Sequence, residues 1–444
     1  MINPRPPIAP ATTWSLAPPD TRVLDNGLTV HSYHRPGQHV VAASLLVPVP
    51  LSAEPPEHEG VAALTAATLT EGTSTHPGIA FAQAVESSGA VLDAGIGYSH
   101  IEASLDVPRS RLHRAAPLFA EAIDTPQLAD ADVDRQRRIH QAHLEQALAR
   151  GADRAQQALR HQLFDPSCRE QRLAGGEVST LTTVTGAQVR QYHRQHFGPD
   201  QGTLVVAGDT TEAGLESLLE SFNSWTNGEQ RVSTWQDPDP QPPSALIVDR
   251  PGSVQADLRW AWFTLDRQDP RWPAFQLGAH CLGGGFLSRM NRVLREERGY
   301  TYGVHLAQAP MRRGGFSYVH GSFRTDVVGP TLHLLPSLVD VKSTPLTDLE
   351  IAQARDYLLG VTPMKYATAS GLCASVITLL AAGLDTDFIN QQRHLWKDVT
   401  AAEATDAVAS LLDPAAGTLV IVGDAAELEP QVTAAGWQPT IESS

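Results

Sequence analysis

The sequence predicts an α+β protein of two homologous domains, each with a largely antiparallel sheet packed by helices. Three observations predict this fold class. The chain has 444 residues, too many for one ordinary hydrophobic core. Hairpin signals alternate with helical periodicity in each half, which is typical of α+β domains. A helix start at Val184 and a buried strand at 203–209 recur at Val399 and 418–424, both shifted by 215 residues, so the halves are a duplication.

Local patterns predict the elements of the first half. Asn26-Gly27 lies between two alternating runs, which is the strongest short-range signal of a β-hairpin. Apolar runs and alternating patterns predict further strands at 40–49, 90–96, 100–107 and 203–209. Helical spacing predicts helices at 60–69, 79–85, 109–123 and 132–163, and another that opens at Val184 and Thr185.

Two polar, Pro-rich segments divide the chain. The start, 1–20, lacks the apolar core of a secretory signal and is predicted to be a loose arm. The segment 226–245 has no apolar period and is predicted to be an interdomain linker. The sequence therefore predicts a first domain at 21–225 and a second at 246–440.

Composition excludes several classes of function. The net charge of −16 without a basic stripe disfavours nucleic-acid partners. No apolar run approaches the length of a membrane span, so no membrane association is expected. Cys168, Cys281 and Cys373 have no metal-ligand spacing and are predicted to be reduced, buried thiols of a cytoplasmic protein.

The segment 282–303 carries the clearest candidate site. Gly283, Gly284 and Gly285 allow a turn with unusual dihedrals and close backbone approach. An apolar helical face is then predicted from the spacing of Phe286, Met290, Val293 and Leu294. Gly299 is predicted to end the helix, and a strand is predicted to begin at 300–304.

Two polar side chains of this segment are candidates for function. Arg295 would lie on the last helical turn and Tyr302 just past the corner, so both could face one cleft. The alternative on local pattern alone is a solvated helix end beside a half-buried tyrosine.

The runs Leu-Gly-Gly-Gly-Phe-Leu-Ser-Arg and Leu-Arg-Glu-Glu-Arg-Gly-Tyr-Thr-Tyr-Gly resemble the C-terminal domain of the M16 zinc metallopeptidases, the family of insulinases and mitochondrial processing peptidases. The resemblance extends from about Leu24 to Trp437. It implies two homologous α+β domains that enclose a substrate chamber. It also implies that Arg295 and Tyr302 hold the substrate backbone near the scissile bond.

The same resemblance implies a degenerate zinc site. Active members carry His-x-x-Glu-His on the first long helix, where two histidines bind zinc and the glutamate activates water. In this chain Ala63 and Ala67 occupy the histidine positions and Ala66 occupies that of the base. His143 falls near the third ligand, with Glu145 beside it. Alanine has no donor atom, so no zinc is expected in this chain.

Other chemistry has weaker support. The pairs His31/His34, His140/His143 and His193/His196 have a possible metal-ligand spacing, but each lacks an evident third ligand and base. No Gly-x-Ser-x-Gly motif occurs, and the glycine run lacks the Gly-Lys-Ser/Thr ending of a phosphate loop.

The resemblance therefore implies a non-catalytic, substrate-binding subunit of a heterodimeric bacterial M16B peptidase. No activity is expected from the chain alone. A partner M16 subunit with His-x-x-Glu-His would supply the zinc, and a peptide would be the substrate. Arg295 and Tyr302 would act in trans on the carbonyl and the developing oxyanion. The alternative is a catalytically inactive scaffold or peptide-binding protein of the same fold, and a self-sufficient hydrolase with a new metal site ranks third.

Overall fold

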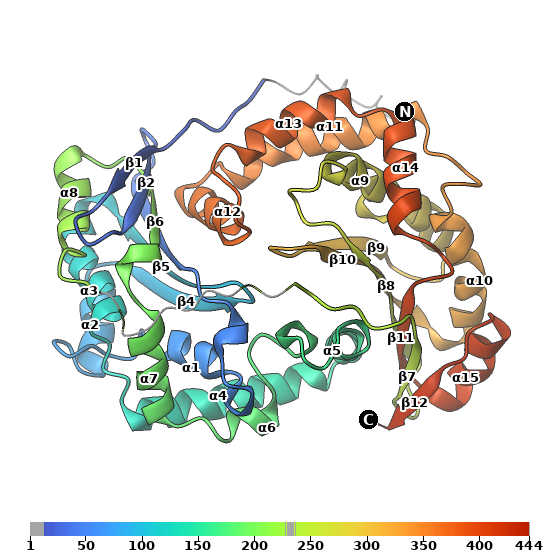
Figure 1. Cartoon of the computed structure of the whole chain (residues 1–444), viewed down its shortest axis with the longest axis horizontal. Helices are drawn as coiled ribbons and strands as arrows, with labels where there is room; N and C mark the ends of the chain where they lie inside the picture. The colour runs from blue at the N-terminus through green and yellow to red at the C-terminus, as the bar shows by residue number, and fades with distance from the viewer. Residues whose placement is uncertain (1–12, 227, 229–234, 236, 444) are drawn as a thin grey trace, which may run out of the picture.

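A computed structural model describes residues 13–226, 228, 235 and 237–443, and its strands form two six-stranded sheets (Figure 1). The first sheet has the order β1-β2-β6-β3-β5-β4, and the second has the order β12-β7-β11-β8-β10-β9. All neighbours are antiparallel except β2 with β6, β7 with β11 and β7 with β12. The prediction of an α+β fold with two largely antiparallel sheets is confirmed.

The strands divide between the halves of the chain. Those of the first sheet are β1 (Asp20–Val23), β2 (Thr29–His34), β3 (Val40–Val47), β4 (Val91–Gly97), β5 (His100–Pro108) and β6 (Thr203–Gly208). Those of the second sheet are β7 (Ala245–Asp249), β8 (Gln255–Thr264), β9 (Val304–Pro310), β10 (Gly315–Arg324), β11 (Thr418–Gly423) and β12 (Thr440–Ser443).

Helices follow a similar order in both halves. The first half contains α1 (Val61–Thr68), α2 (Ile79–Ser87), α3 (Leu112–Asp124), α4 (Asp130–Leu148), α5 (Gly151–Leu163), α6 (Val178–Leu181), α7 (Gly186–His196) and α8 (Glu212–Glu220). The second contains α9 (Trp272–Ala279), α10 (Val328–Val339), α11 (Asp348–Lys365), α12 (Ala369–Ala381), α13 (Phe388–Asp398), α14 (Ala401–Leu411) and α15 (Ala425–Ala434). Two π-helical segments, His280–Gly284 and Asn291–Glu297, follow α9.

The duplication is visible in the caps of corresponding helices. Thr185 forms a capping box with Gln188 at the start of α7. Thr400 forms the same box with Glu403 at the start of α14, again 215 residues later. Strands β6 and β11 also begin and end at positions separated by 215 residues. These caps satisfy backbone N–H groups at each helix start, so the repeated sequence specifies repeated helix boundaries.

The predicted hairpin is present at the start of the first sheet. Strands β1 and β2 pair antiparallel, with Val23 opposite Thr29. Between them, Gly27 has φ 91°, which side chains other than glycine rarely adopt. The Leu28 carbonyl accepts a hydrogen bond from the Leu24 amide at 2.9 Å and closes the turn.

Each sheet has one face covered by helices of its own half and the other covered by a helix of the opposite half. Helix α5 crosses to the second sheet and packs against β8 and β11. There, Leu159 and Phe164 lie in one apolar cluster with Val420 and Val422. Neighbouring residues of β11, such as Ile421, belong to the core on the opposite face. Both faces of β11 are therefore buried, which explains its continuous apolar run.

Helix α12 makes the reciprocal exchange and packs on β3 and β6 of the first sheet (Figure 1). Cys373 and Val376 share a cluster there with Ala42 and Val205. The Cys373 thiol lies 3.5 Å from the Val205 carbonyl oxygen, to which it donates. All three cysteines are free and buried, as predicted. The two halves are consequently interlocked rather than merely adjacent.

This exchange corrects the prediction of one helix at 132–163. Helix α4 ends at Leu148 and α5 begins at Gly151. Arg150, with ψ 131°, is extended and breaks the helix. The chain changes direction at this point because α4 packs on its own half, whereas α5 must reach the second sheet.

Parts of the predicted arm and linker lie outside the described residues, namely 1–12 and most of 227–236. The boundaries 21–225 and 246–440 remain a proposal, because α5 and α12 each contribute to the opposite half. Within the part of the chain that the structure describes, none of the helices combines the length and the apolar composition of a membrane span. Helices α11 and α12 meet both requirements only when taken as a pair, and they bend by 114° at their junction.

Candidate functional site

Helix α1 carries the positions where the family resemblance implies zinc ligands. Ala63 and Ala66 are buried, and Ala67 is half-buried. Their methyl groups have no lone pair to give a metal and no group that can accept a proton from water. The residues of α1 therefore do not fit zinc.

The histidines of the alternative pairs either contact other groups of the protein or are exposed to solvent. Nε2 of His140 lies 3.0 Å from the Gly175 carbonyl oxygen, and His143 is exposed. His193 Nε2 donates to the Ile123 carbonyl oxygen at 2.8 Å, and burial lowers the pKa of this imidazole to about 4. His31 contacts Thr21. No group of three or more His, Cys, Asp or Glu side chains in the described part of the chain is arranged to hold a metal ion.

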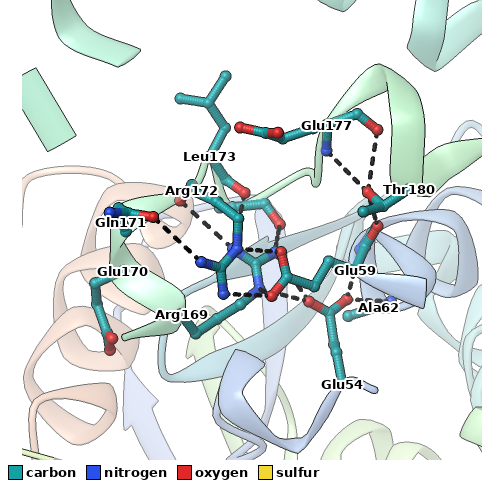
Figure 2. Close-up of polar contacts among 12 residues, drawn as sticks. Glu54, Glu59, Ala62, Arg169, Glu170, Gln171, Arg172, Leu173, Glu177 and Thr180 are labelled. Atoms are coloured by element: carbon teal, nitrogen blue, oxygen red, sulfur yellow. Dashed lines mark hydrogen bonds and ion pairs between the residues drawn. The ribbon is translucent and has the colours of Figure 1, made fainter. Parts of the chain in front are cut away.

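A buried ionic cluster positions the start of α1 (Figure 2). The Glu54 carboxylate accepts hydrogen bonds from the amides of Gly60 and Ala62 at 3.0 and 2.9 Å. It also pairs with Arg169, whose Nε and Nη2 lie 3.0 and 2.9 Å from Oε2. Burial raises the pKa of Glu54, although Arg169 and the two amides oppose that shift. Glu54 therefore serves as a distant cap for α1 and ties it to the segment that follows α5.

A second carboxylate completes the cluster. Glu59 forms two hydrogen bonds with the Arg172 guanidinium, both at 2.6 Å. Its backbone carbonyl accepts from the Thr180 hydroxyl at 2.8 Å. Arg169 additionally donates to the carbonyl oxygens of Leu173 and Ala174. No local sequence pattern predicts this cluster, because its paired carboxylates and arginines are more than 100 residues apart.

The glycine run serves close packing rather than unusual dihedrals. None of the three glycines has a positive φ, so that part of the prediction is wrong. A Cβ on Gly283 would lie 2.6 Å from the backbone nitrogen and Cβ of Leu306 in β9. A Cβ on Gly284 or Gly285 would lie 3.0–3.1 Å from the His280 ring. The run therefore lets the π-helical turn His280–Gly284 approach the edge strand β9, as the other part of the prediction expected.

The following helix differs from the predicted one in register and in extent. Met290 and Leu294 are fully buried, but Phe286 is 73% exposed. The helical segment Asn291–Glu297 has π-type hydrogen bonding, which is frequent at functional sites. A π-helical turn contains more residues than an α-helical turn, so residues three or four apart no longer lie on the same face. Gly299 has φ 63° and its amide bonds the Arg295 carbonyl, so the predicted helix end is confirmed.

Two side chains anchor this helix to its surroundings. Buried Asn291 donates to the Gly285 carbonyl at 3.2 Å and accepts from the Val304 amide at 3.0 Å. Strand β9 begins at Val304, so the predicted strand start at 300–304 comes at the last residue of that range. Arg289 forms two bonds with Glu350 at the start of α11, at 2.6 and 2.8 Å. Burial acts to raise the pKa of Glu350, but Arg289 and the Thr347 cap outweigh it and hold the value at about 2.

Arg295 and Tyr302 differ in their surroundings. The Arg295 guanidinium lies over the Phe286 ring, 3.7 Å from its centroid, and donates to the Phe286 carbonyl oxygen and the Glu296 carboxylate, both at 2.8 Å. Tyr302 is 98% exposed. It lies in the irregular stretch between Gly299 and β9 and makes no hydrogen bond within the described residues. The expectation that both face one cleft stays a prediction.

Comparison with known proteins agrees with this architecture. The family model described as "Insulinase (Peptidase family M16)" matches residues 29–176, and "Peptidase M16 inactive domain" matches residues 183–358. An uncharacterized zinc protease of Mycobacterium tuberculosis is 25% identical over 369 residues, which cover 79% of this chain and 81% of the relative. Another, from Rickettsia bellii, is 22% identical over 313 residues, covering 68% and 73%.

Solved structures show the same fold. A peptidase M16 inactive domain from Pseudomonas fluorescens has a TM-score of 0.84 and 22% identity, covering 91% of this chain and 98% of that one. A protease from Helicobacter pylori has a TM-score of 0.83 and 13% identity, covering 92% and 100%. A chain of complex III from Candida albicans has a TM-score of 0.78 and 12% identity, covering 95% and 100%. With family models matching most of its length, the chain belongs to the M16 peptidase family.

Proposed function

We propose that this chain is the non-catalytic, substrate-binding subunit of a heterodimeric M16 zinc peptidase. A partner M16 subunit with His-x-x-Glu-His would supply the zinc and the general base. This chain would supply Arg295 and Tyr302 to the peptide bond undergoing hydrolysis. A cytoplasmic location belongs to the same proposal and is supported by three free, buried thiols.

The observation that carries the proposal is the contrast between two corresponding regions of the chain. Helix α1 presents only methyl groups at the ligand and base positions, yet the segment after the glycine run retains a tyrosine that is 98% exposed. Tyrosine is enriched where a protein surface meets another molecule. Its phenol can donate to a carbonyl oxygen that gains charge in the transition state.

Arg295 supports the same role because its position is prepared in advance. The Phe286 ring and carbonyl oxygen and the Glu296 carboxylate fix the guanidinium. Behind it, Asn291 and Arg289 attach the helix to β9 and α11. A donor that is already ordered loses little entropy when it meets substrate, so more of its bond strength remains for the transition state.

Peptide binding has a further structural basis in strand β4. It is the last strand of the first sheet, packs against α1, and presents one edge without a partner strand in the described part of the chain. An extended peptide can add to such an edge through main-chain hydrogen bonds. A hollow of about 230 Å³ lies over β4 and β5, beside residues that include Asp93, His100 and Glu102.

The test is turnover by the complex reconstituted with the zinc-bearing partner. Arg295→Ala and Tyr302→Phe should each lower kcat about 100- to 1,000-fold, because each removes a transition-state hydrogen bond. Arg292→Ala is the matched control, since Arg292 is exposed on the same helix and has only a 4.0 Å contact with Glu297. Tyr300→Phe is the control for loss of a phenol near the same turn. Co-purification with the partner should be unchanged in all variants.

The alternative function is an inactive M16-fold scaffold or a peptide-binding protein without a proteolytic role. The likeness to a chain of complex III is the observation that favours it. Equal turnover by the wild-type complex and by the Arg295→Ala/Tyr302→Phe double variant would establish this alternative and refute catalysis in trans.

A further inference from the structure

A cavity of about 380 Å³ lies between the two halves of the chain. One wall comes from Tyr98 in the turn between β4 and β5 and from His100 at the start of β5, together with Arg160 of α5. The opposite wall comes from the turn between β9 and β10, together with Arg267 and the end of α12. The cavity exists only because the two halves interlock, so neither half could form it alone.

The charge of this cavity is opposite to that of the chain. Arg160, Arg267, Arg312 and Arg313 line it, whereas Glu170 is the one carboxylate among the lining residues that the structure describes. The whole chain has a net charge of −16. His100 also lines the cavity, but burial lowers its pKa to about 4, so it is neutral near pH 7. Guanidinium groups therefore supply the positive charge.

Three of these arginines form no ion pair with a carboxylate of the residues that the structure describes. Arg160 donates to the backbone oxygen of Glu170 at 2.7 Å and lies over the Tyr98 ring, 4.2 Å from its centroid. Arg312 makes only a long bond of 3.4 Å to the Ala381 carbonyl and a contact with an aromatic ring. Arg267 has no hydrogen bond or ion pair with any described residue. Arg313 differs, since it pairs with Asp237 at 3.4 Å in an exposed position.

Such an arrangement is costly unless something compensates it. Burial lowers the pKa of Arg160, Arg267 and Arg312, and for Arg312 the neighbouring Arg313 adds to the effect. Each shift means that the surroundings disfavour the cation. Arg160 is buried, and Arg267 and Arg312 are half-buried. Cations withdrawn from water in proteins are normally paired with carboxylates, phosphates or bound anions. An anion in the cavity would remove this penalty at three sites together.

We propose that this cavity binds a carboxylate of the peptide substrate, either an acidic side chain or the C-terminal group. Guanidinium groups accept carboxylates in bidentate geometry, and their bonds strengthen where water is displaced. The remaining walls include Tyr98, Met311 and Phe316, which suit the aliphatic part of a peptide side chain. The volume accommodates a side chain or a chain end rather than a folded domain. The inference rests on the proposed function insofar as the ligand is a peptide.

The experiment measures peptide binding by the isolated full-length chain and needs neither partner nor zinc. The probes are four N-acetylated, unlabelled Gly/Ala/Ser decapeptides with one central Glu or Gln, each ending in a free carboxylate or an amide, and isothermal titration calorimetry measures their affinity. A carboxylate ligand should bind about 10- to 100-fold more tightly than its amide counterpart, as expected for charge-assisted bonds. The Glu/Gln comparison reports an acidic side chain, and the acid/amide comparison reports the chain end.

Variants locate the preference in the cavity. Arg267→Gln and the double variant Arg267→Gln/Arg312→Gln should abolish it, and loss of Arg267 breaks no bond that supports the fold. Arg324→Gln is the matched control, because Arg324 lies at the other end of β10, is exposed, and pairs with Asp326. Its removal lowers the net charge equally and should leave the preference unchanged.

Three outcomes would overturn the inference: equal affinity for all four peptides, no binding of any of them, or a carboxylate preference that survives the double variant. Competition by inorganic phosphate without any carboxylate preference would likewise overturn it and indicate a phosphate site. Because this assay does not involve Arg295 or Tyr302, a failure here leaves catalysis in trans untouched. A failure of the turnover test would equally leave this binding result standing.

Discussion

Replacement of Arg169 by Met should strongly destabilise the first half of the molecule. The Arg169 side chain is 4% exposed, and it separates two carboxylates, Glu54 and Glu59, that are almost fully buried (Figure 2). Methionine keeps much of the volume but removes the cation and its bonds to the Leu173 and Ala174 carbonyls. Breaking a buried pair by removing one partner costs about 3–5 kcal/mol, because the remaining charge stays desolvated.

That cost can be converted into a melting temperature. One kcal/mol shifts Tm by about 2–4 °C in a domain of 150–250 residues, so Arg169→Met should lower Tm by roughly 6–20 °C. Far-UV circular dichroism during heating measures the change. Arg172→Met is the matched comparison. Arg172 is 21% exposed, and its carboxylate partner is Glu59. It should cost less, because the Glu59 carboxylate keeps a second cation, Arg169, whose Nε lies 3.7 Å away.

A double variant tests the physical reason. Glu54→Gln/Arg169→Met removes both charges, so it should cost less than the sum of the two single variants. A single Arg169→Met variant that melts with the wild-type protein would refute the reasoning. So would a double variant whose cost equals that sum, since the two groups would then act independently.

The remaining predictions concern metal binding and pH. The purified wild-type chain should bind no stoichiometric zinc, and one tightly bound zinc per chain with chelator-sensitive proteolysis would contradict this. The triple variant Ala63→His/Ala66→Glu/Ala67→His should yield no peptidase activity, because exposed His143 supplies no third ligand. Folding stability should fall as pH drops from about 6.5 to about 4. In this range the His193 imidazole takes up a proton in the unfolded chain, but in the folded chain burial holds its pKa at about 4 and it stays neutral. The free energy of unfolding should fall by up to about 3 kcal/mol as a result. Denaturant unfolding of His193→Gln at several pH values should show a shallower dependence, whereas His143→Gln should match wild type.

The sequence by itself determined the features that depend on neighbouring residues. The Asn26-Gly27 hairpin, the helix end at Gly299 and the two capping boxes at Thr185 and Thr400 are all present. Each depends on backbone conformations or hydrogen bonds within a few residues, so local sequence specifies it. The duplication followed because the same local signals recur at one shift. The absence of donor atoms at Ala63, Ala66 and Ala67 follows from their chemistry and needs no structure.

Only the tertiary structure decided which surfaces meet. Periodicity predicts that a face of α5 or α12 is buried, but apolar faces of similar composition fit either sheet. The exchange of these helices depends on packing between residues far apart in the chain, such as Phe164 with Val420. The Arg169 cluster and the arginine-lined cavity arise in the same way, since long-range folding brings their charges together. The exposure of Phe286 also required the structure, because Phe286 lies in the turn before the helix begins, where helical spacing does not apply.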